Sequence, residues 1–427
     1  MATTTRAVLR QRLSEEIGDY QSLTTTSDGN SAGTSVVDTG LRNLSGGADD
    51  AAFDNKFVLI TSGANTGETR MVKDYIANST TLVMQESFSG GAVESLVTYE
   101  LHSYDPAQKH QAISRAIAEL YPFLYLPLRD ETVVVDDRLS NSDFETFSGG
   151  FTGWTEVGSP TVTADTTTLI HGSLAAKMVG DSGAAGQLTQ APSINTNEIT
   201  NKAVTLKCWV WCAAADTARI RLDWDGSDID SSVYHNGQNE WQLLDVTASV
   251  PTSATQVKAI LEVVASGTAY FDACWLDAGP IQKYTIPTAF ANGPHYLTEQ
   301  GDEARPNGEY YPIRGNPTAG RRLRMEGMGL LSRPSSDSAT TEVGDPQLSI
   351  ITTYAAMYLF RTMSVSNAVQ ERGGYADMAT TFSRDAVRMA AQPGLRMPRL
   401  GGQHHRDIWH TEEDSSGRYI VFDRMRV

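Results

Sequence analysis

One helix-forming segment constrains the fold of this chain more than any other feature. It is the stretch YDPAQKHQAISRAIAELYP, residues 104–122, which lies between long regions rich in strand and turn residues. Asp105 is a good N-cap, and Pro106 suits the first helical position, where a missing N–H costs nothing. An apolar stripe follows at helical spacing, formed by Ile113, Ala116, Ile117 and Leu120. Such a helix buries only one face, so its partners must come from elsewhere in the chain.

Partner helices are predicted near both ends of the chain. Residues 3–20 (TTTRAVLRQRLSEEIGDY) repeat apolar side chains every four residues, with threonines to cap the start and a glycine to end the helix. Residues 344–363 (GDPQLSIITTYAAMYLFRTM) carry a second stripe, and residues from about 375 to 391 carry a third. These stripes indicate one helical core assembled from segments that are distant in sequence.

The regions between these helices read as β structure. Short apolar runs bounded by turn residues indicate a small β module, and strand-like runs then recur without an intervening helix, which favours an antiparallel two-sheet sandwich. The predicted fold is α+β and multidomain: a discontinuous helical bundle with an inserted small β module and an inserted jelly-roll β-sandwich. The predicted segments are 1–23 (N-terminal helix), 24–102 (small β module), 103–130 (core helix), 137–281 (jelly-roll sandwich), 282–344 (β extension), 345–392 (C-terminal core helices) and 393–427 (irregular tail).

Charge and cysteine usage narrow the class of protein. The formal net charge of −17 argues against a protein that wraps DNA with clustered Lys and Arg, although a negative wall suits a channel through which DNA slides. Three cysteines give no disulfide framework, as is typical of a reducing cytoplasm. No signal segment is evident, and the apolar run at 354–360 is far shorter than the roughly 20 residues of a membrane span. We expect a soluble protein that folds in a reducing cytoplasm and binds no membrane.

Catalytic and zinc motifs are not readable in the sequence. There is no Ser-His-Asp order, P-loop or GxGxxG pattern, and we therefore expect no enzyme activity. His404, His405 and His410 lack the partner spacing of a zinc site, and an irregular tail is the favoured interpretation. The basic run RRLRMEG, residues 321–327, is expected to be a solvated strand end, with contact to DNA phosphate or an acidic partner as the alternative.

The helical segments resemble the head-to-tail adaptor (connector) proteins of tailed bacteriophages. The resemblance rests on an N-terminal helix, on DPAQKHQAISRAIAELYPFLY, and on the late pair PQLSIITTYAAMYLF and MATTFSRDAVRMA. It implies a virion protein that forms a twelve-subunit ring beneath the portal, contacts a tail or neck protein below, and lines a channel that DNA crosses without sequence-specific binding. The large β insertions depart from the short adaptors. Residues expected to contact the portal are Arg396, Arg399 and Arg406.

The region 137–281 resembles jelly-roll carbohydrate-binding modules. The resemblance rests on the opening NSDFETFSGGFTGW, residues 141–154, and on the closing AYFDACWLD, residues 269–277. It implies a sandwich that can serve as an outward decoration of the virion or as a glycan-binding module, and such modules often hold a structural calcium. The implied calcium ligands are Asp143, Glu145, Asp272 and Asp277, and solvated turn carboxylates are the alternative. No other cofactor is expected.

A candidate sugar-binding face follows from strand alternation. In KCWVWCA the two tryptophans share a face opposite the cysteines, and tryptophans two residues apart stand about 7 Å from each other, which suits successive sugar rings. If this strand pairs with ARIRLDW, one outer face collects Trp209, Trp211, Arg219, Arg221 and Asp223. A neighbouring strand or domain that covers the rings is the alternative. The sandwich interior is expected to hold Trp154, Trp224 and Trp241.

Two functions from different classes therefore remain. The first is a structural adaptor that joins capsid to tail. The alternative is a capsid or tail-fibre protein that recognises surface polysaccharide through the sandwich. An adaptor predicts a closed ring that binds a portal, whereas a fibre predicts a trimer that binds glycan.

Overall fold

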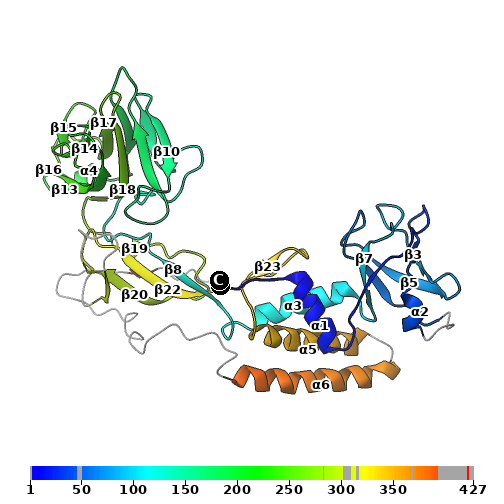
Figure 1. Cartoon of the computed structure of the whole chain (residues 1–427). Coiled ribbons are helices and arrows are strands. Elements are labelled where there is room, and N and C mark those ends of the chain that lie inside the picture. The colour runs from blue at the N-terminus through cyan, green and yellow to red at the C-terminus, as the bar shows by residue number, and fades with distance from the viewer. Residues whose placement is uncertain are drawn as a thin grey trace. The chain divides into compact units, whose positions relative to one another are not determined.

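The computed structural model describes residues 2–45, 51–281, 283–301, 309–313, 317–366, 369–392 and 421–422. The chain divides into two compact units, the first comprising Met1–Leu126 and Gly329–Gly401, and the second comprising Pro127–Met328 and Gly402–Val427. The first unit holds the long helices and a small β-barrel, and the second holds a β-sandwich and a four-stranded sheet (Figure 1). None of the helices in the described residues is long and apolar enough to cross a bilayer.

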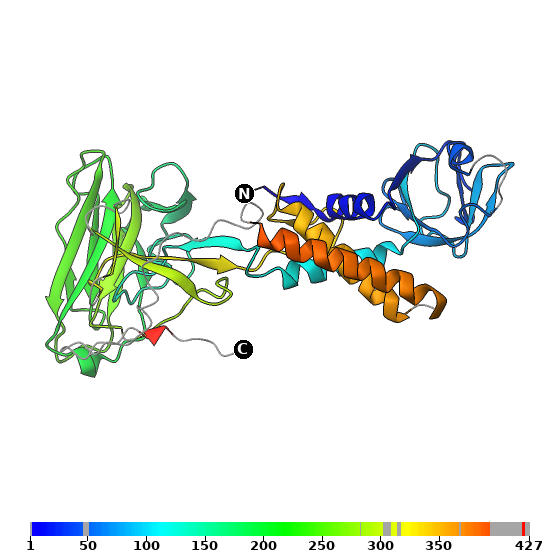
Figure 2. The same cartoon turned by 90° about the horizontal axis from the view of Figure 1, so that it is seen from below.

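Helices from both ends of the chain and from its middle share one core, as the apolar stripes predict. α3 packs against α1 and α5, and α6 packs along α5 (Figure 2). The core between them is formed by side chains such as Leu13, Ile113 and Ile351, each with no exposed surface. The helices are α1 (Arg6–Glu16), α3 (Pro106–Glu119), α5 (Leu348–Ser366) and α6 (Val369–Ala391), with short α2 (Leu41–Leu44) and α4 (Thr196–Ile199) elsewhere.

The helix ends follow local chemistry with one exception. Thr5 caps α1 by accepting from the Val8 N–H, and Asp105 caps α3 by accepting from the Ala107 N–H at 2.8 Å. α6, expected from about residue 375, begins earlier at Val369. Its first part contains two glycines, which disfavour helix locally. Packing along α5 supplies the stabilisation that local propensity lacks.

The small β module is a closed six-stranded barrel. Its strands run in the order β2 (Gln21–Thr24), β7 (Thr98–His102), β4 (Phe57–Ile60), β5 (Thr69–Ile76), β6 (Thr81–Met84) and β3 (Ser35–Val37). The Thr26 N–H donates to the Val37 carbonyl at 3.0 Å, which joins the first and last strands. Outside the barrel, β1 (Thr4–Thr5) pairs with β23 (Thr340–Thr341). Closure leaves the barrel no long free edge.

A buried network of charged side chains joins the barrel to the helices. Arg10 of α1 makes two hydrogen bonds to Glu100 of β7, at 2.8 and 2.9 Å. His102 binds the same carboxylate at 2.9 Å, and Lys109 of α3 lies 3.0 Å from the other nitrogen of that ring. Lys109 also donates to Asp19 at 2.8 Å. Alternating charges thus balance one another inside the first unit, where an unpaired charge would be costly.

Two antiparallel five-stranded sheets form the sandwich of the second unit. The sheet called F here has the order β10 (Thr161–Asp165), β11 (Ala175–Val179), β18 (Thr268–Asp277), β13 (Ala203–Trp211) and β16 (Trp241–Ser249). The sheet called H has the order β15 (Ile229–Ser231), β14 (Ala218–Asp223), β17 (Lys258–Val263), β12 (Gly186–Gln190) and β9 (Thr155–Val157). Their inner faces enclose one apolar core, so the predicted two-sheet sandwich is confirmed.

A separate four-stranded sheet, the extension sheet, completes the second unit. Its order is β21 (Tyr310–Pro312), β20 (Pro294–Gln300), β22 (Leu323–Gly329) and β8 (Leu126–Asp130), and β19 (Lys283–Tyr284) pairs with β24 (Val421–Phe422). β8 falls within segment 103–130, for which the sequence predicts a core helix. The helix instead ends at Glu119, and the chain turns into a strand after Pro122.

Candidate functional site

Strand β13 presents different chemistry on its two faces. Cys208, Val210 and Cys212 have no exposed surface and point into the sandwich core. Trp209 and Trp211 alternate with them and therefore lie on the outer face of sheet F, where both are half-buried. Period-2 alternation predicted this part of the site.

β13 and β14 do not pair, so the condition for the candidate sugar-binding face is not met. β13 pairs with β16 and β18 in sheet F, whereas β14 pairs with β15 and β17 in sheet H. The chain crosses the core between the two strands, and consecutive strands of a sandwich often change sheet in this way. The two tryptophans and the side chains of β14 therefore do not share a face.

The polar side chains of β14 are engaged in local ion pairs. Arg219 and Arg221 both bind the Glu262 carboxylate, at 2.6 and 2.5 Å. Asp223 is buried and lies 2.9 Å from the Lys258 ammonium. The Arg219 guanidinium also stacks over the Tyr234 ring, 4.7 Å from its centroid. This arrangement stabilises the outer face of sheet H.

An aromatic row crosses the outer face of sheet F. We define it as Trp241, Trp211 and Tyr270, which lie directly opposite one another on β16, β13 and β18. The rings of Trp211 and Tyr270 meet edge to face with centroids 5.1 Å apart. Lys177 lies next in the row and approaches the Tyr270 ring at 5.7 Å. All three aromatic side chains are half-buried, so part of each ring faces solvent.

Sequence reasoning missed two members of this row. Trp241 was expected in the interior with Trp154 and Trp224, which do lie in the core with 9% and 0% of their surfaces exposed. Alternation along WQLLDVTAS carried the missing signal, because Trp241 has the same parity as Asp245, an exposed carboxylate. Tyr270 becomes a neighbour of Trp211 only through the register of β18.

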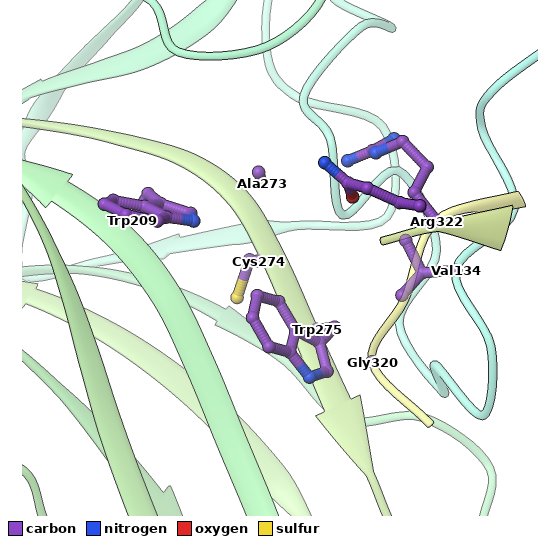
Figure 3. A pocket seen from close by; sticks show the side chains of 8 residues that line it. Val134, Trp209, Ala273, Cys274, Trp275, Gly320 and Arg322 are labelled. Atoms are coloured by element: carbon purple, nitrogen blue, oxygen red, sulfur yellow. The ribbon is translucent and has the colours of Figure 1, made fainter. Parts of the chain in front are cut away.

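The other end of this face is covered by the extension sheet. Trp275 is 5% exposed, and with Trp209 it lines a cavity of about 20 Å³, which has room for one water molecule. Figure 3 shows these rings on the sandwich side of the cavity, with Val134 and Arg322 on the opposite side. The alternative that a neighbouring strand covers the rings therefore applies in part to Trp209, which stays half-buried beside the cavity, and does not apply to the aromatic row.

The carboxylates implied as calcium ligands are occupied by hydrogen-bond donors of the protein. Asp272 accepts from the Ile170, His171 and Ala273 N–H groups at 2.7–2.9 Å. Asp277 accepts from the Gly279 N–H at 2.9 Å. Burial raises the pKa of Asp272 to about 7, although these hydrogen bonds act in the opposite direction.

Glu145 is held by a loop of the sandwich. Its carboxylate accepts from the Ser173 and Leu174 N–H groups at 2.8 and 3.0 Å. The close approach depends on Gly172, whose φ is +66° and where a Cβ would lie 2.0 Å from a Glu145 oxygen. Within the described residues, no group of three or more His, Cys, Asp or Glu side chains is arranged to hold a metal ion. The four carboxylates as placed do not fit a calcium site.

The basic run at 321–327 is engaged within the protein rather than presented as a solvated strand end. Arg322 is buried with 5% of its surface exposed, and Arg324 donates to Glu131 at 2.8 Å. The residues expected to contact a portal, Arg396, Arg399 and Arg406, lie outside the described residues, as do the tail histidines.

Comparisons with known proteins concern about a third of the chain. The C-terminal family 22 carbohydrate-binding module of Clostridium thermocellum Xyn10B is 19% identical over 34% of this chain and 98% of that chain, with a TM-score of 0.28. The xylan-binding CBM22-1 domain of Paenibacillus barcinonensis Xyn10C is 16% identical over 35% of this chain and 94% of that chain, with a TM-score of 0.26.

A phage protein is also among the similar structures. The enzymatically active domain of tailspike protein 4 of bacteriophage CBA120 is 20% identical over 34% of this chain, with a TM-score of 0.26, and the match spans 22% of that domain. No protein-family model matches the chain, and no curated protein matches it either.

Proposed function

We propose that the sandwich is a carbohydrate-binding module whose binding surface is the aromatic row of sheet F. The observation that carries this proposal is the row itself: three solvent-facing aromatic rings, contributed by three adjacent strands, at the uncovered end of an otherwise packed face. Each ring is carried by a paired strand, and the rings of Trp211 and Tyr270 also contact each other, so little conformational entropy is lost when a ligand binds.

Sugar rings suit this surface for a physical reason. One face of a pyranose presents C–H groups, and an aromatic ring offers them a flat apolar surface with negative charge above its plane. Adjacent strands lie about 4.8 Å apart, so three consecutive strands offer a platform about 10 Å wide, enough for two sugar rings. Lys177 at one end adds a donor for ring hydroxyl or acidic groups. In a virion, such a module would recognise surface polysaccharide without catalysis.

The test is binding of the full chain to soluble polysaccharides (xylan, β-1,4-galactan and bacterial lipopolysaccharide) by affinity electrophoresis and calorimetry. We expect Trp211→Ala to lose at least about tenfold in affinity for whichever polysaccharide binds, because a central ring of this kind contributes about 2 kcal/mol. Tyr234→Ala removes a half-buried aromatic ring that packs with Arg219 of sheet H, and it should bind like the wild type. A folded Trp211→Ala protein with unchanged affinity would refute the proposed binding surface. A wild-type protein that binds none of the three polysaccharides would refute the proposal that the module recognises glycans of these kinds.

A second candidate, the ring-forming adaptor, is favoured by the helical core. Three chain segments separated by all-β insertions return to one bundle, which is the arrangement that the resemblance to connector proteins implies. Under this proposal the sandwich decorates a ring that joins capsid to tail, and glycan binding is an added property. Native mass measurement separates the oligomeric forms: a closed ring supports the adaptor, whereas a trimer without affinity for a portal supports a fibre.

A further inference from the structure

Arg322 is a buried cation at the junction of the extension sheet and the sandwich. Its side chain is 6% exposed, and one terminal nitrogen lies 3.9 Å from the Asp143 carboxylate. The same nitrogen donates to the Glu131 carbonyl at 2.7 Å. The backbone of Arg322 forms an isolated β-bridge with Val134, and β22 begins at the next residue. These two contacts fix the position of Arg322. A guanidinium removed from water needs such partners.

Asp143 of the sandwich lies beside this cation, and the charge of Arg322 also acts on the buried carboxylate of Asp272. Asp143 follows the opening of the sandwich and Asp272 belongs to its last strand, with 6% and 0% of their surfaces exposed. Backbone N–H groups stabilise Asp272, as described above, yet hydrogen bonds from neutral donors do not cancel a buried net charge. A positive charge at this position therefore stabilises the fold of the sandwich.

We infer that Arg322 supplies, from within the chain, the positive charge that the resemblance assigns to a calcium ion, and that it thereby fastens the extension sheet to the sandwich. Calcium takes six to eight oxygen ligands at roughly 2.3–2.6 Å. Here the nearby carboxylate oxygens already accept protein N–H groups, and a guanidinium 3.9 Å from Asp143 repels a second cation. The extension sheet thus supplies a positive charge that stabilises the buried carboxylates of the sandwich.

Backbone hydrogen bonds reinforce this attachment. Val135 donates to the Arg321 carbonyl at 2.9 Å, and Leu323 donates to the Val133 carbonyl at 2.8 Å, so Arg322 lies between two fixed positions. On the sandwich side, Arg138 donates through its N–H to the Leu276 carbonyl at 3.0 Å. The segment 133–138 is therefore hydrogen-bonded both to the strand region around Arg322 and to the sandwich. These bonds hold the Arg322 guanidinium close to Asp143.

The experiment measures calcium binding by calorimetry and thermal unfolding by tryptophan fluorescence on the full chain. We expect the wild type to bind no calcium at millimolar concentration and to keep its Tm when EDTA is added. Arg322→Met should lower the Tm by about 10 °C, because it leaves buried carboxylates without their cation. A second substitution, Asp143→Asn, should restore part of that loss, because it removes a buried negative charge. Arg321→Met is the matched control, since Arg321 is more exposed and lies 3.7 Å from Glu299.

Two results would overturn the inference. One is a wild-type protein that binds calcium at the sandwich or loses stability in EDTA. The other is an Arg322→Met protein whose Tm equals that of Arg321→Met. Should Arg322→Met fail to fold, Arg322→Lys decides the matter, because it retains the charge: we expect it to fold and to be insensitive to calcium. If calcium raised the Tm of Arg322→Lys, the inference that the charge of Arg322 takes the place of a calcium ion would be wrong.

Discussion

Glu100 illustrates how one buried carboxylate depends on its neighbours. Burial alone would raise its pKa, but hydrogen bonds from His102 and Arg10, together with the charge of Arg10, lower the pKa to about 2. A carboxylate whose folded pKa lies below its unfolded value stabilises the fold above the unfolded pKa. That contribution disappears as the pH falls toward the folded pKa. Glu100 therefore makes the first unit sensitive to acid between about pH 4.5 and 2.

The corresponding prediction concerns Glu100→Gln. We expect this variant to lose about 3 kcal/mol of unfolding free energy at neutral pH, because the buried Arg10 loses one of its two carboxylate partners and keeps only Asp337. The gap between wild type and variant should narrow as the pH falls from about 5 to 2, since the wild type loses the same contribution by protonation. Chemical unfolding followed by far-ultraviolet circular dichroism reports on the long helices of this unit.

Glu119→Gln is the control for this measurement. Glu119 lies on the same helix as Lys109 but is 53% exposed, and its pair with Arg115 at 3.9 Å is a surface pair of small value. Its stability should follow the wild type at every pH. If the unfolding free energy of Glu100→Gln were lower than that of the wild type by the same amount at every pH, the charge of the Glu100 carboxylate would not be the source of the stabilisation.

Individual elements follow their local patterns closely. The stripes of α1, α3 and α5 predicted which faces are buried, and alternation in β13 predicted which side chains point outward. The sequence predicts the boundaries of these elements less well than their faces. α6 begins before its apolar stripe, and β8 follows α3 within a segment that was expected to belong to the core helix. Pattern identifies a face, whereas packing against a partner decides where an element begins or ends.

Strand partners could not be predicted from alternation. β13 and β14 are consecutive, and adjacency in sequence favours pairing, yet they lie in different sheets. The aromatic row arises from the registers of β16 and β18 on β13, which bring residues about 30 and 60 positions away beside Trp211. A one-residue change of register would turn Trp241 to the other face, so the site depends on long-range pairing.

At the scale of the whole molecule, the second unit is expected to fold by itself. Its sandwich and extension sheet are joined by backbone hydrogen bonds and by Arg322, and nearly all its strands find partners between residues 127 and 328. We predict that a fragment of residues 127–328 unfolds in one cooperative transition. A fragment of residues 137–281 lacks the sheet that covers Trp275 and should unfold at a lower temperature.

Tryptophan fluorescence and calorimetry of the two fragments provide the measurement. The shorter fragment should show a red-shifted emission, because Trp209 and Trp275 lose the wall formed by Val134 and Arg322. Equal melting temperatures for the two fragments would contradict a structural role of the extension sheet in the second unit.

The sequence by itself determined the helical stripes, the two-sheet character of the sandwich and the outward orientation of Trp209 and Trp211. These properties depend on residue type and spacing within a few turns or strands, which is the range of local steric and hydrophobic forces. Tertiary structure alone decided that Trp241 and Tyr270 lie beside Trp211, that Trp209 lines a cavity together with Val134 and Arg322, and that Arg322 lies near Asp143. Such contacts join residues far apart in the chain, and many alternative strand pairings satisfy the same local pattern. Only the packing of the complete second unit selects one of them.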